Sequence, residues 1–249
     1  MEIAQGTSRT GKRFFGIQIP PDLRWSHFFN LYAASFLIAC LMVLPAIIQP
    51  LFLKEVINIP SNRAGTINSG LQNMSQIATL LFIGLIGVIS DRVGRRILAV
   101  LGFLIAGVFF ILFGYAKDIS LAMGISSVGG QIFVTYVIRF IIGIGIILCF
   151  PQTITMVADY TTPGDRGKAM AWHGAMMALG SMIVFGVLAR IASTMGLMSF
   201  FYISGAIGLL GVIVSRLGLV DRMSKVKSQK AGVKDVYREV SKSLALKVG

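Results

Sequence analysis

The ionisable side chains of Arg139 and His173 lie inside long apolar runs of this 249-residue sequence. An unpaired guanidinium within the hydrocarbon of a bilayer is costly, so Arg139 is expected to face a cavity or a partner. In a cavity its fixed positive charge favours an anionic ligand, whereas the alternative is a side chain that extends to the outer membrane surface. His173 lies near the end of its run, where it is either a proton-binding site or, as we favour, a hydrogen-bonded residue at the interface.

Other reactive groups are scarce in these apolar runs. None of the runs has an Asp or Glu near its middle, so the sequence offers no obvious carboxylate for proton coupling. Cys40 and Cys149 both lie within apolar runs, where a cysteine is mostly a small packing residue. The runs contain no cluster of His, Cys or carboxylates with the spacing of metal ligands, and no paired nucleophile and base. We therefore expect neither an enzyme nor a bound metal or cofactor.

Polar side chains are unevenly distributed among the runs. The first, second, fourth and fifth runs carry the candidates for a substrate path: Asn30, Gln49, Asn73, Gln76, Arg139, Gln152 and His173. The third and sixth runs have few polar residues, so the other four are expected to line a polar path while these two face lipid. A single Asn or Gln has an alternative role, which is a hydrogen bond between neighbouring helices.

Six apolar runs must position these side chains. The sequence is 55% hydrophobic and only 13% charged, which is too apolar for an ordinary soluble domain. A helix of roughly 20 residues spans the hydrocarbon of a bilayer. Runs of this length cover residues 28–53, 71–90, 97–116, 131–158, 169–189 and 197–219. The sequence predicts an all-α, polytopic membrane protein with a leader of residues 1–27, a six-helix bundle of residues 28–219 and a basic, amphipathic tail of residues 220–249.

The formal net charge of +13 is distributed asymmetrically between the loops. If all six runs cross a bilayer, one side holds the basic residues of the leader, of residues 92–96, of residues 166–168 and of the tail. The other side holds only four basic residues, Lys54, Arg63, Lys117 and Arg190. Because basic residues near spans collect on the cytoplasmic side, we expect both termini in the cytoplasm and the cell membrane as the location. The positive charge is then explained by the orientation of the spans in the membrane, and no nucleic-acid partner is expected.

The loop between the second and third runs has a distinctive sequence, Gly-Val-Ile-Ser-Asp-Arg-Val-Gly-Arg-Arg, which extends from Gly87 to Arg96. Positive charge on the cytoplasmic side accounts for the arginines, but not for Asp91 among them or for a glycine at both Gly87 and Gly94. Asp91 at a helix end, beside Arg92, can accept hydrogen bonds and pair with cations. The two glycines permit a close approach of helices and a tight turn.

This loop resembles the signature between helices two and three of the major facilitator superfamily. A second stretch is similar to the family's fourth-helix pattern and the loop after it: Arg139, Gly143, Gly145, Pro151, Asp159, Pro163, Arg166 and Gly167. The resemblance implies a cytoplasmic gate, made of Gly87, Asp91, Arg92, Gly94, Arg95, Arg96, Asp159, Arg166 and Gly167. Such a network of charges at a membrane surface can hold one conformation closed and release it when helices tilt. The alternative role of these charges is only to set the topology.

Small residues and prolines within the spans are interpreted as packing and kink positions, with Gly143, Gly145 and Pro151 as the candidates on the fourth span. Small residues let helices pack closely. A proline removes one backbone hydrogen bond and permits a kink. On helices that move during transport, both features ease the motion.

The resemblance also implies a bundle of two inverted three-helix repeats, and it covers only the first half of the family's twelve-helix architecture. Alternating access needs a second six-helix half, which belongs to a longer form of the same chain, to a separate chain or to a second copy. We expect secondary active or facilitative transport of a small solute, such as an organic anion, by a symporter or antiporter. The alternative is a non-transporting membrane protein with an assembly or regulatory role.

Overall fold

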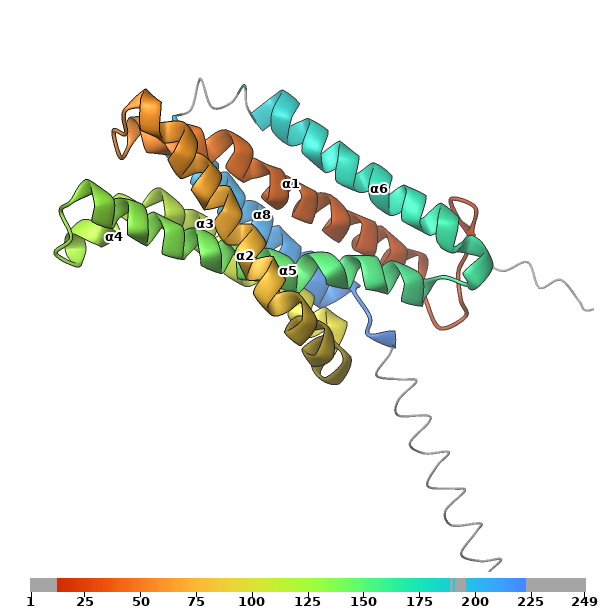
Figure 1. Cartoon of the computed structure of the whole chain (residues 1–249). Coiled ribbons are helices and arrows are strands. Elements are labelled where there is room, and N and C mark those ends of the chain that lie inside the picture. The colour runs from red at the N-terminus through yellow and green to blue at the C-terminus, as the bar shows by residue number, and fades with distance from the viewer. Residues whose placement is uncertain (1–12, 189, 191–195, 223–249) are drawn as a thin grey trace, which may run out of the picture.

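The computed structural model describes residues 13–188, 190 and 196–222 as an elongated bundle of helices (Figure 1). A hairpin of two short strands, β1 (Arg13–Phe14) and β2 (Ile17–Gln18), precedes the bundle. The helices are α1 (Trp25–Glu55), α2 (Ser61–Val93), α3 (Arg95–Gly114), α4 (Ala116–Ala122), α5 (Val128–Tyr160), η1 (Pro163–Asp165), α6 (Arg166–Ile183), η2 (Val184–Leu188) and α8 (Leu197–Gly218). Of the basic tail, only residues 220–222 are described, so the predicted surface helix lies outside the described residues.

Six helices are long and apolar enough to cross a membrane, namely α1, α2, α3, α5, α6 with the turns that flank it, and α8. This confirms the six predicted spans and the helical fold class. The ends of some helices differ from the ends of the predicted apolar runs, because hydropathy and helix formation do not stop at the same residue. The helix α2 already begins at Ser61, ten residues before the apolar run, because a polar stretch can be helical without being suited to hydrocarbon. The third span ends at Gly114, and the short helix α4 follows it.

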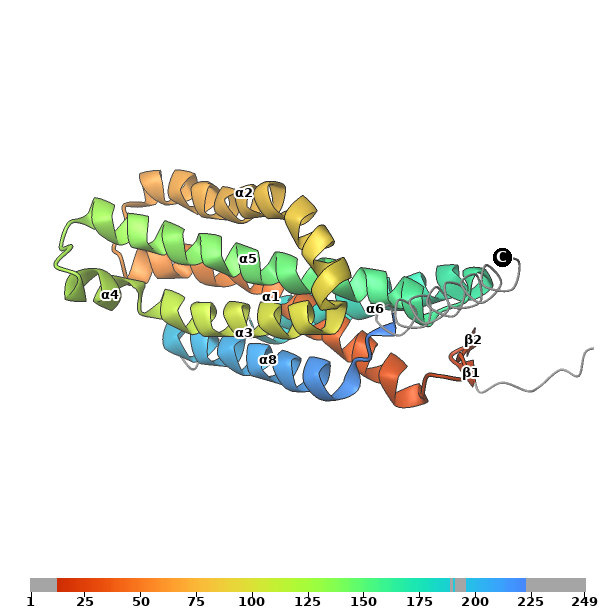
Figure 2. The same ribbon diagram turned by 90° about the horizontal axis from the view of Figure 1, so that it is seen from below.

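The helices pack around α3 and α1. The helix α3 lies between α5 and α8, α1 packs against α6 and α8, and α2 runs along α5 (Figure 2). At the crossing of α3 and α5, a Cβ on Gly102 would lie 2.6 Å from the carbonyl oxygen of Gly145. A Cβ on Gly145 would in turn lie 2.7 Å from the backbone nitrogen of Ala106, so both glycines are close-packing positions. A Cβ on Gly143 would lie 3.0 Å from the Cα of Ser75 on α2.

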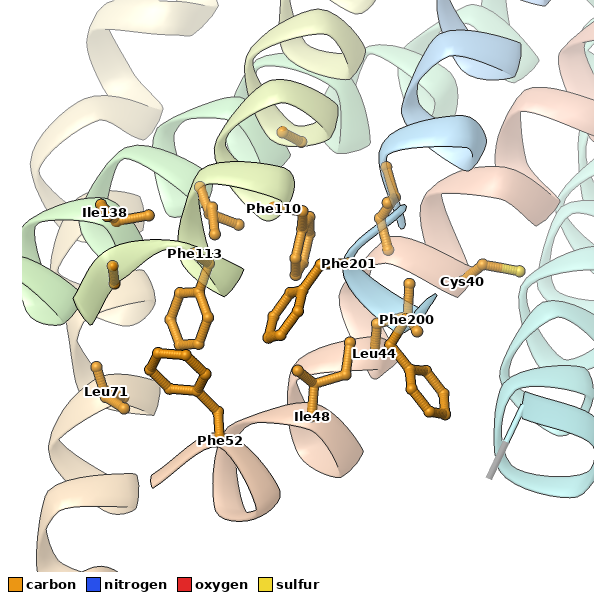
Figure 3. Packing of buried hydrophobic residues seen from close by; sticks show 14 of the residues in the cluster. Cys40, Leu44, Ile48, Phe52, Leu71, Phe110, Phe113, Ile138, Phe200 and Phe201 are labelled. Carbon is orange, nitrogen blue, oxygen red and sulfur yellow. The ribbon is translucent and has the colours of Figure 1, made fainter. Parts of the chain in front are cut away.

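A cluster of aromatic rings packs near one end of the bundle. We call the end that carries the hairpin and the start of α1 the hairpin end, and the other the opposite end. Near the opposite end, Phe52 of α1 packs against Phe113 of α3 and Phe201 of α8, with ring centroids 5.0 Å and 5.8 Å away. Figure 3 shows these rings converging with Phe110 and Ile48. This apolar cluster fixes the relative positions of α1, α3 and α8 near the opposite end.

The hairpin is the only β-structure among the described residues. Its turn consists of Phe15 and Gly16, with φ angles of +45° and +82°, which is the combination of a type I′ turn. The turn places Phe14 and Ile17, which are 3% and 0% exposed, in an apolar cluster with Phe28. Strands of two residues leave no periodic pattern in a sequence, so hydropathy does not reveal them.

Candidate functional site

A cavity of about 370 Å³ lies between α1, α2 and α5. One wall is a polar face of α2, whose members recur at helical spacing: Gln72, Ser75, Gln76 and Thr79. The walls from α1 and α5 are apolar apart from Arg139, and they include Leu41, Met42, Pro45, Ile146, Ile147, Phe150 and Pro151. The cavity therefore combines a single cationic group with hydrogen-bonding groups on one side and hydrocarbon on the other.

Arg139 lies on α5 with 4% of its surface exposed. Its Nη2 donates a hydrogen bond of 3.4 Å to Oε1 of Gln72, while its Nε has no partner. No carboxylate pairs with it in the part of the chain that the structure describes. Of the alternatives open from the sequence, the structure places the guanidinium at a cavity. It retains capacity to donate further hydrogen bonds there.

Gln49 of α1 lines a smaller void together with Arg139, Pro45 and apolar side chains of α3 and α8. The residue is 1% exposed, and neither atom of its amide has a hydrogen-bond partner among the described residues. An amide buried without partners is unfavourable. The neighbourhood of Arg139 therefore holds two side chains with unused hydrogen-bonding groups.

Charged residues of three helices meet at the hairpin end. Arg95 at the start of α3 donates a hydrogen bond to Asp159 near the end of α5. Nη2 of Arg95 also lies 3.9 Å from Oδ1 of Asp91 in the last turns of α2. The side chains of Arg95 and Asp159 are 12% and 21% exposed, whereas that of Asp91 is 56% exposed. Arg95 thus links three helices, and its pair with Asp159 is the more buried of the two.

The other residues of the predicted gate lie between Gly87 near the end of α2 and Arg96 at the start of α3, or in the first turn of α6. Arg96 donates a hydrogen bond to the backbone oxygen of Arg216 near the end of α8. Gly94 has a φ of +107°, and a Cβ at this position would overlap the carboxylate of Asp221. The remaining members are exposed, and they are Gly87, Arg92, Arg166 and Gly167.

A second cavity, of about 330 Å³, lies between the ends of α2 and α5 and is lined by Gly87, Asp91 and Arg95. Within it, Oγ of Ser90 donates a hydrogen bond of 2.5 Å to Oε1 of Gln152. Both cavities are lined by Pro151. The charged network and the Arg139 cavity therefore lie along the same interface between α2 and α5.

Of the seven predicted substrate-path residues, Arg139 and Gln76 line the larger cavity, Gln49 and Gln152 line the smaller void and the second cavity, and the other three line none of them. The side chain of Asn30 donates a hydrogen bond of 2.7 Å to the backbone oxygen of Ser26 in its own helix. His173 is buried, and its Nδ1 lies 2.8 Å from Oγ of Ser35, so it joins α6 to α1. Asn73 lies on the exposed face of α2. Among the described residues, α6 supplies no lining residue to the larger cavity.

The structure also brings together residues that the sequence did not single out. Nε of Arg222, after α8, lies 3.0 Å from Oδ2 of Asp22, before α1. Its Nη1 donates a hydrogen bond of 2.7 Å to the backbone oxygen of Asp159. The hydroxyl of Tyr160 donates to the backbone oxygen of Val220 at 2.9 Å. A basic residue after the last span was visible in the sequence, but its partners depend on the fold. On α2, by contrast, the polar spacing of the cavity wall was a usable signal.

Comparisons with known proteins agree with this architecture. The family described as Major Facilitator Superfamily matches residues 31–247. Magnetosome protein MamH of Paramagnetospirillum magneticum is 32% identical over 191 residues, which cover 77% of this chain and 43% of that protein. Multidrug resistance protein 1 of Bacillus subtilis is 28% identical over 152 residues, which cover 59% of this chain and 36% of that protein.

A solved structure has the same fold. The inward-open xylose transporter XylE from E. coli superimposes with a TM-score of 0.62 at 19% identity, over 87% of this chain and 55% of that one. The chain spans less than half the length of the two curated relatives. The family match covers most of the sequence and both loop motifs. The chain therefore belongs to the major facilitator superfamily.

Proposed function

We propose that this chain forms one half of a secondary transporter, in which it and a second six-helix bundle expose a shared solute site to each side of the membrane in turn. The observation that carries the proposal is the cavity at Arg139, where a buried cation and a polar wall face each other across the interface of α2 and α5. Such polar groups at membrane depth typically mark substrate paths. The names of two similar proteins, a multidrug resistance protein and a xylose transporter, support transport as the class of activity.

The second bundle is proposed to cover α2 and α6. These helices are the least buried of the six, with 17% of the residues in the most apolar window of each buried. On α2, the amides of Asn73 and Gln76 are exposed in this half. An amide that faces lipid has no hydrogen-bond partner and is disfavoured by several kcal/mol, so a second bundle or a water-filled path next to α2 is favoured.

The charged network at the hairpin end is proposed to be the cytoplasmic gate. The asymmetry of basic residues supports this orientation, because Arg92, Arg95 and Arg96 lie at that end together with Arg166 and Lys168. Tilting α2 relative to α5 requires the contacts around Arg95 to change, since Arg95 touches residues of both helices. The gate then opens when this network rearranges.

Flux into liposomes tests the proposal. In liposomes that contain only this chain, two copies must supply the two bundles. Three radiolabelled probes that cross lipid slowly represent the classes of solute: benzenesulfonate, xylose and tetraethylammonium. We expect flux of at least one probe above that of protein-free liposomes, rising more steeply than linearly with the number of chains per liposome. Asp91→Ala is expected to abolish this flux.

The matched control is Asp118→Ala, which removes an exposed carboxylate of α4 at the opposite end. This variant is expected to retain flux. If all three probes fail to enter, or if Asp91→Ala and Asp118→Ala behave alike, the result favours the non-transporting, assembly role over transport by this chain.

A further inference from the structure

We propose that the Arg139 cavity binds a small organic monoanion with an apolar part, with the anionic group at Arg139. The assignment rests on the proposed function and specifies its class of substrate. It follows from three properties of the cavity, which are its charge, the division of its walls and the unused hydrogen-bonding groups beside it.

The charge of the cavity is a single positive one. Arg139 is 4% exposed, and no acidic side chain lines the cavity among the described residues. Its hydrogen bond to Gln72 is long, at 3.4 Å, and Gln72 is neutral. A guanidinium stays charged in proteins and binds carboxylate or sulfonate oxygens through two parallel hydrogen bonds. One cation without a counterion matches one anionic group, and the lack of a lining carboxylate disfavours ligands that carry an ammonium group.

The walls divide into a polar and an apolar side. Gln72, Gln76 and Thr79 of α2 offer hydrogen bonds along one side, whereas Met42 of α1 and Phe150 of α5 belong to the hydrocarbon side. A fully hydrated inorganic anion has no group to place against hydrocarbon. An organic anion buries its apolar part there, which adds favourable free energy in proportion to the area buried. The volume of about 370 Å³ is at the small end of the range for ligand sites.

Gln49 provides the second, independent observation. Its amide is 1% exposed, has no hydrogen-bond partner among the described residues and shares a void with Arg139. The same helix contains Pro45 and Pro50, each of which removes a backbone hydrogen bond and allows α1 to bend. In the proposed bound state, α1 bends at these prolines and brings the amide of Gln49 toward the anionic group held by Arg139. Gln49 is thus the second donor of the bound state.

Equilibrium dialysis of the purified chain in lipid nanodiscs, with empty nanodiscs as background, tests the assignment. The probe is radiolabelled benzenesulfonate, and it is compared with neutral benzenesulfonamide and with methanesulfonate, which lacks the ring. We expect each analogue to bind at least about tenfold more weakly than benzenesulfonate, because each lacks one of the two features. Arg139→Gln is expected to lower the affinity for benzenesulfonate by at least about tenfold and to leave the weak binding of benzenesulfonamide unchanged.

Two further variants separate binding from folding. Arg63→Gln makes the same substitution at an exposed arginine of α2 outside the cavity, and it is expected to bind benzenesulfonate like the unaltered chain. Phe150→Ala shortens the apolar wall without touching the cation. It is expected to weaken the binding of benzenesulfonate while leaving that of methanesulfonate unchanged, and it provides a test even if Arg139→Gln does not fold.

Equal affinity for benzenesulfonate and benzenesulfonamide, or undiminished binding by Arg139→Gln, would overturn the anionic assignment. Equal affinity for benzenesulfonate and methanesulfonate would overturn the inference that the ligand has an apolar part. Binding in nanodiscs requires no transport, so the two proposals fail separately. A chain that binds benzenesulfonate through Arg139 but carries no probe into liposomes contradicts the transport proposal alone, whereas flux of xylose without binding of benzenesulfonate contradicts the ligand assignment alone.

Discussion

Arg222 and Asp22, which lie 200 residues apart, form a two-pronged ion pair in which Nε is 3.0 Å from Oδ2 and Nη2 is 3.2 Å from Oδ1. The pair joins the segment before α1 to the segment after α8. Because the same guanidinium donates to the backbone oxygen of Asp159, it also reaches the end of α5 and the Arg95 network. The hairpin end is therefore held by contacts between segments that are distant in the sequence.

The first prediction concerns this ion pair. Asp22→Asn is expected to lower the free energy of unfolding by about 0.5–1 kcal/mol, because both side chains are about one third exposed and a pair of this kind contributes little in water. Chemical denaturation in detergent measures the change. Asp118→Asn, at an exposed carboxylate of α4, is the control and is expected to have no effect. A loss of more than about 2 kcal/mol would show that the pair is more strongly coupled than its exposure indicates.

The second prediction concerns the docking of the hairpin. The sequence contains two tryptophans, and each contacts the hairpin: Phe14 lies 5.0 Å from Trp25, and Phe15 lies 4.7 Å from Trp172, between ring centroids. Phe14→Ala removes a ring that is 3% exposed, so the hairpin is expected to detach and expose both tryptophans to a more polar surrounding. A shift of tryptophan emission to longer wavelength measures this detachment.

Phe133→Ala is the control for the hairpin, because Phe133 is 65% exposed on the far half of α5. Its emission spectrum is expected to match that of the unaltered chain. If Phe14→Ala leaves the spectrum unchanged, the hairpin does not depend on this ring for its position.

The sequence was sufficient to predict the spans and to single out Arg139, and the physical reason is the same in both cases. Transfer to hydrocarbon favours long apolar runs and strongly disfavours a charge, so the six runs, and Arg139 well inside the fourth of them, stand out without any knowledge of packing. The structure places Arg139 beside the amide of Gln72 at a cavity. Loop sequences between Gly87 and Arg96 then carried the family resemblance, which the family match supports.

Pairings between distant segments were not predictable from the sequence. Nothing local in Asp22 or Arg222 indicates a partner 200 residues away, and the bond between His173 and Ser35 arises from the crossing of α6 and α1. Gln72 was missed for a different reason. It lies at the polar edge of the second apolar run, and only its spacing to Ser75 and Thr79 marks it as part of one helix face.

The third prediction separates the two carboxylates that contact Arg95. Asp159→Asn is expected to lower the free energy of unfolding by about 1–3 kcal/mol, because it deprives a mostly buried guanidinium of the nearer and more buried of its two carboxylates. Asp91→Asn, at a side chain 56% exposed and 3.9 Å away, is expected to change it by less than about 0.5 kcal/mol. In a double-mutant cycle, Arg95→Gln combined with Asp159→Asn is expected to cost less than the sum of the single changes. Additive costs would mean that the pair is not coupled.

The fourth prediction concerns Gln49, whose buried amide has no partner among the described residues. Gln49→Leu replaces the amide with an apolar side chain of similar size, so it is expected to raise the free energy of unfolding of the ligand-free chain by about 1 kcal/mol while weakening the binding of benzenesulfonate. Gln152→Leu is the matched control. The amide of Gln152 accepts a hydrogen bond from Ser90 at 2.5 Å, so the same substitution there is expected to destabilise the chain. A Gln49→Leu variant that is less stable, or that binds benzenesulfonate undiminished, would contradict the role of Gln49 as a donor kept for the ligand, because the amide would then contribute to the ligand-free fold or be dispensable for binding.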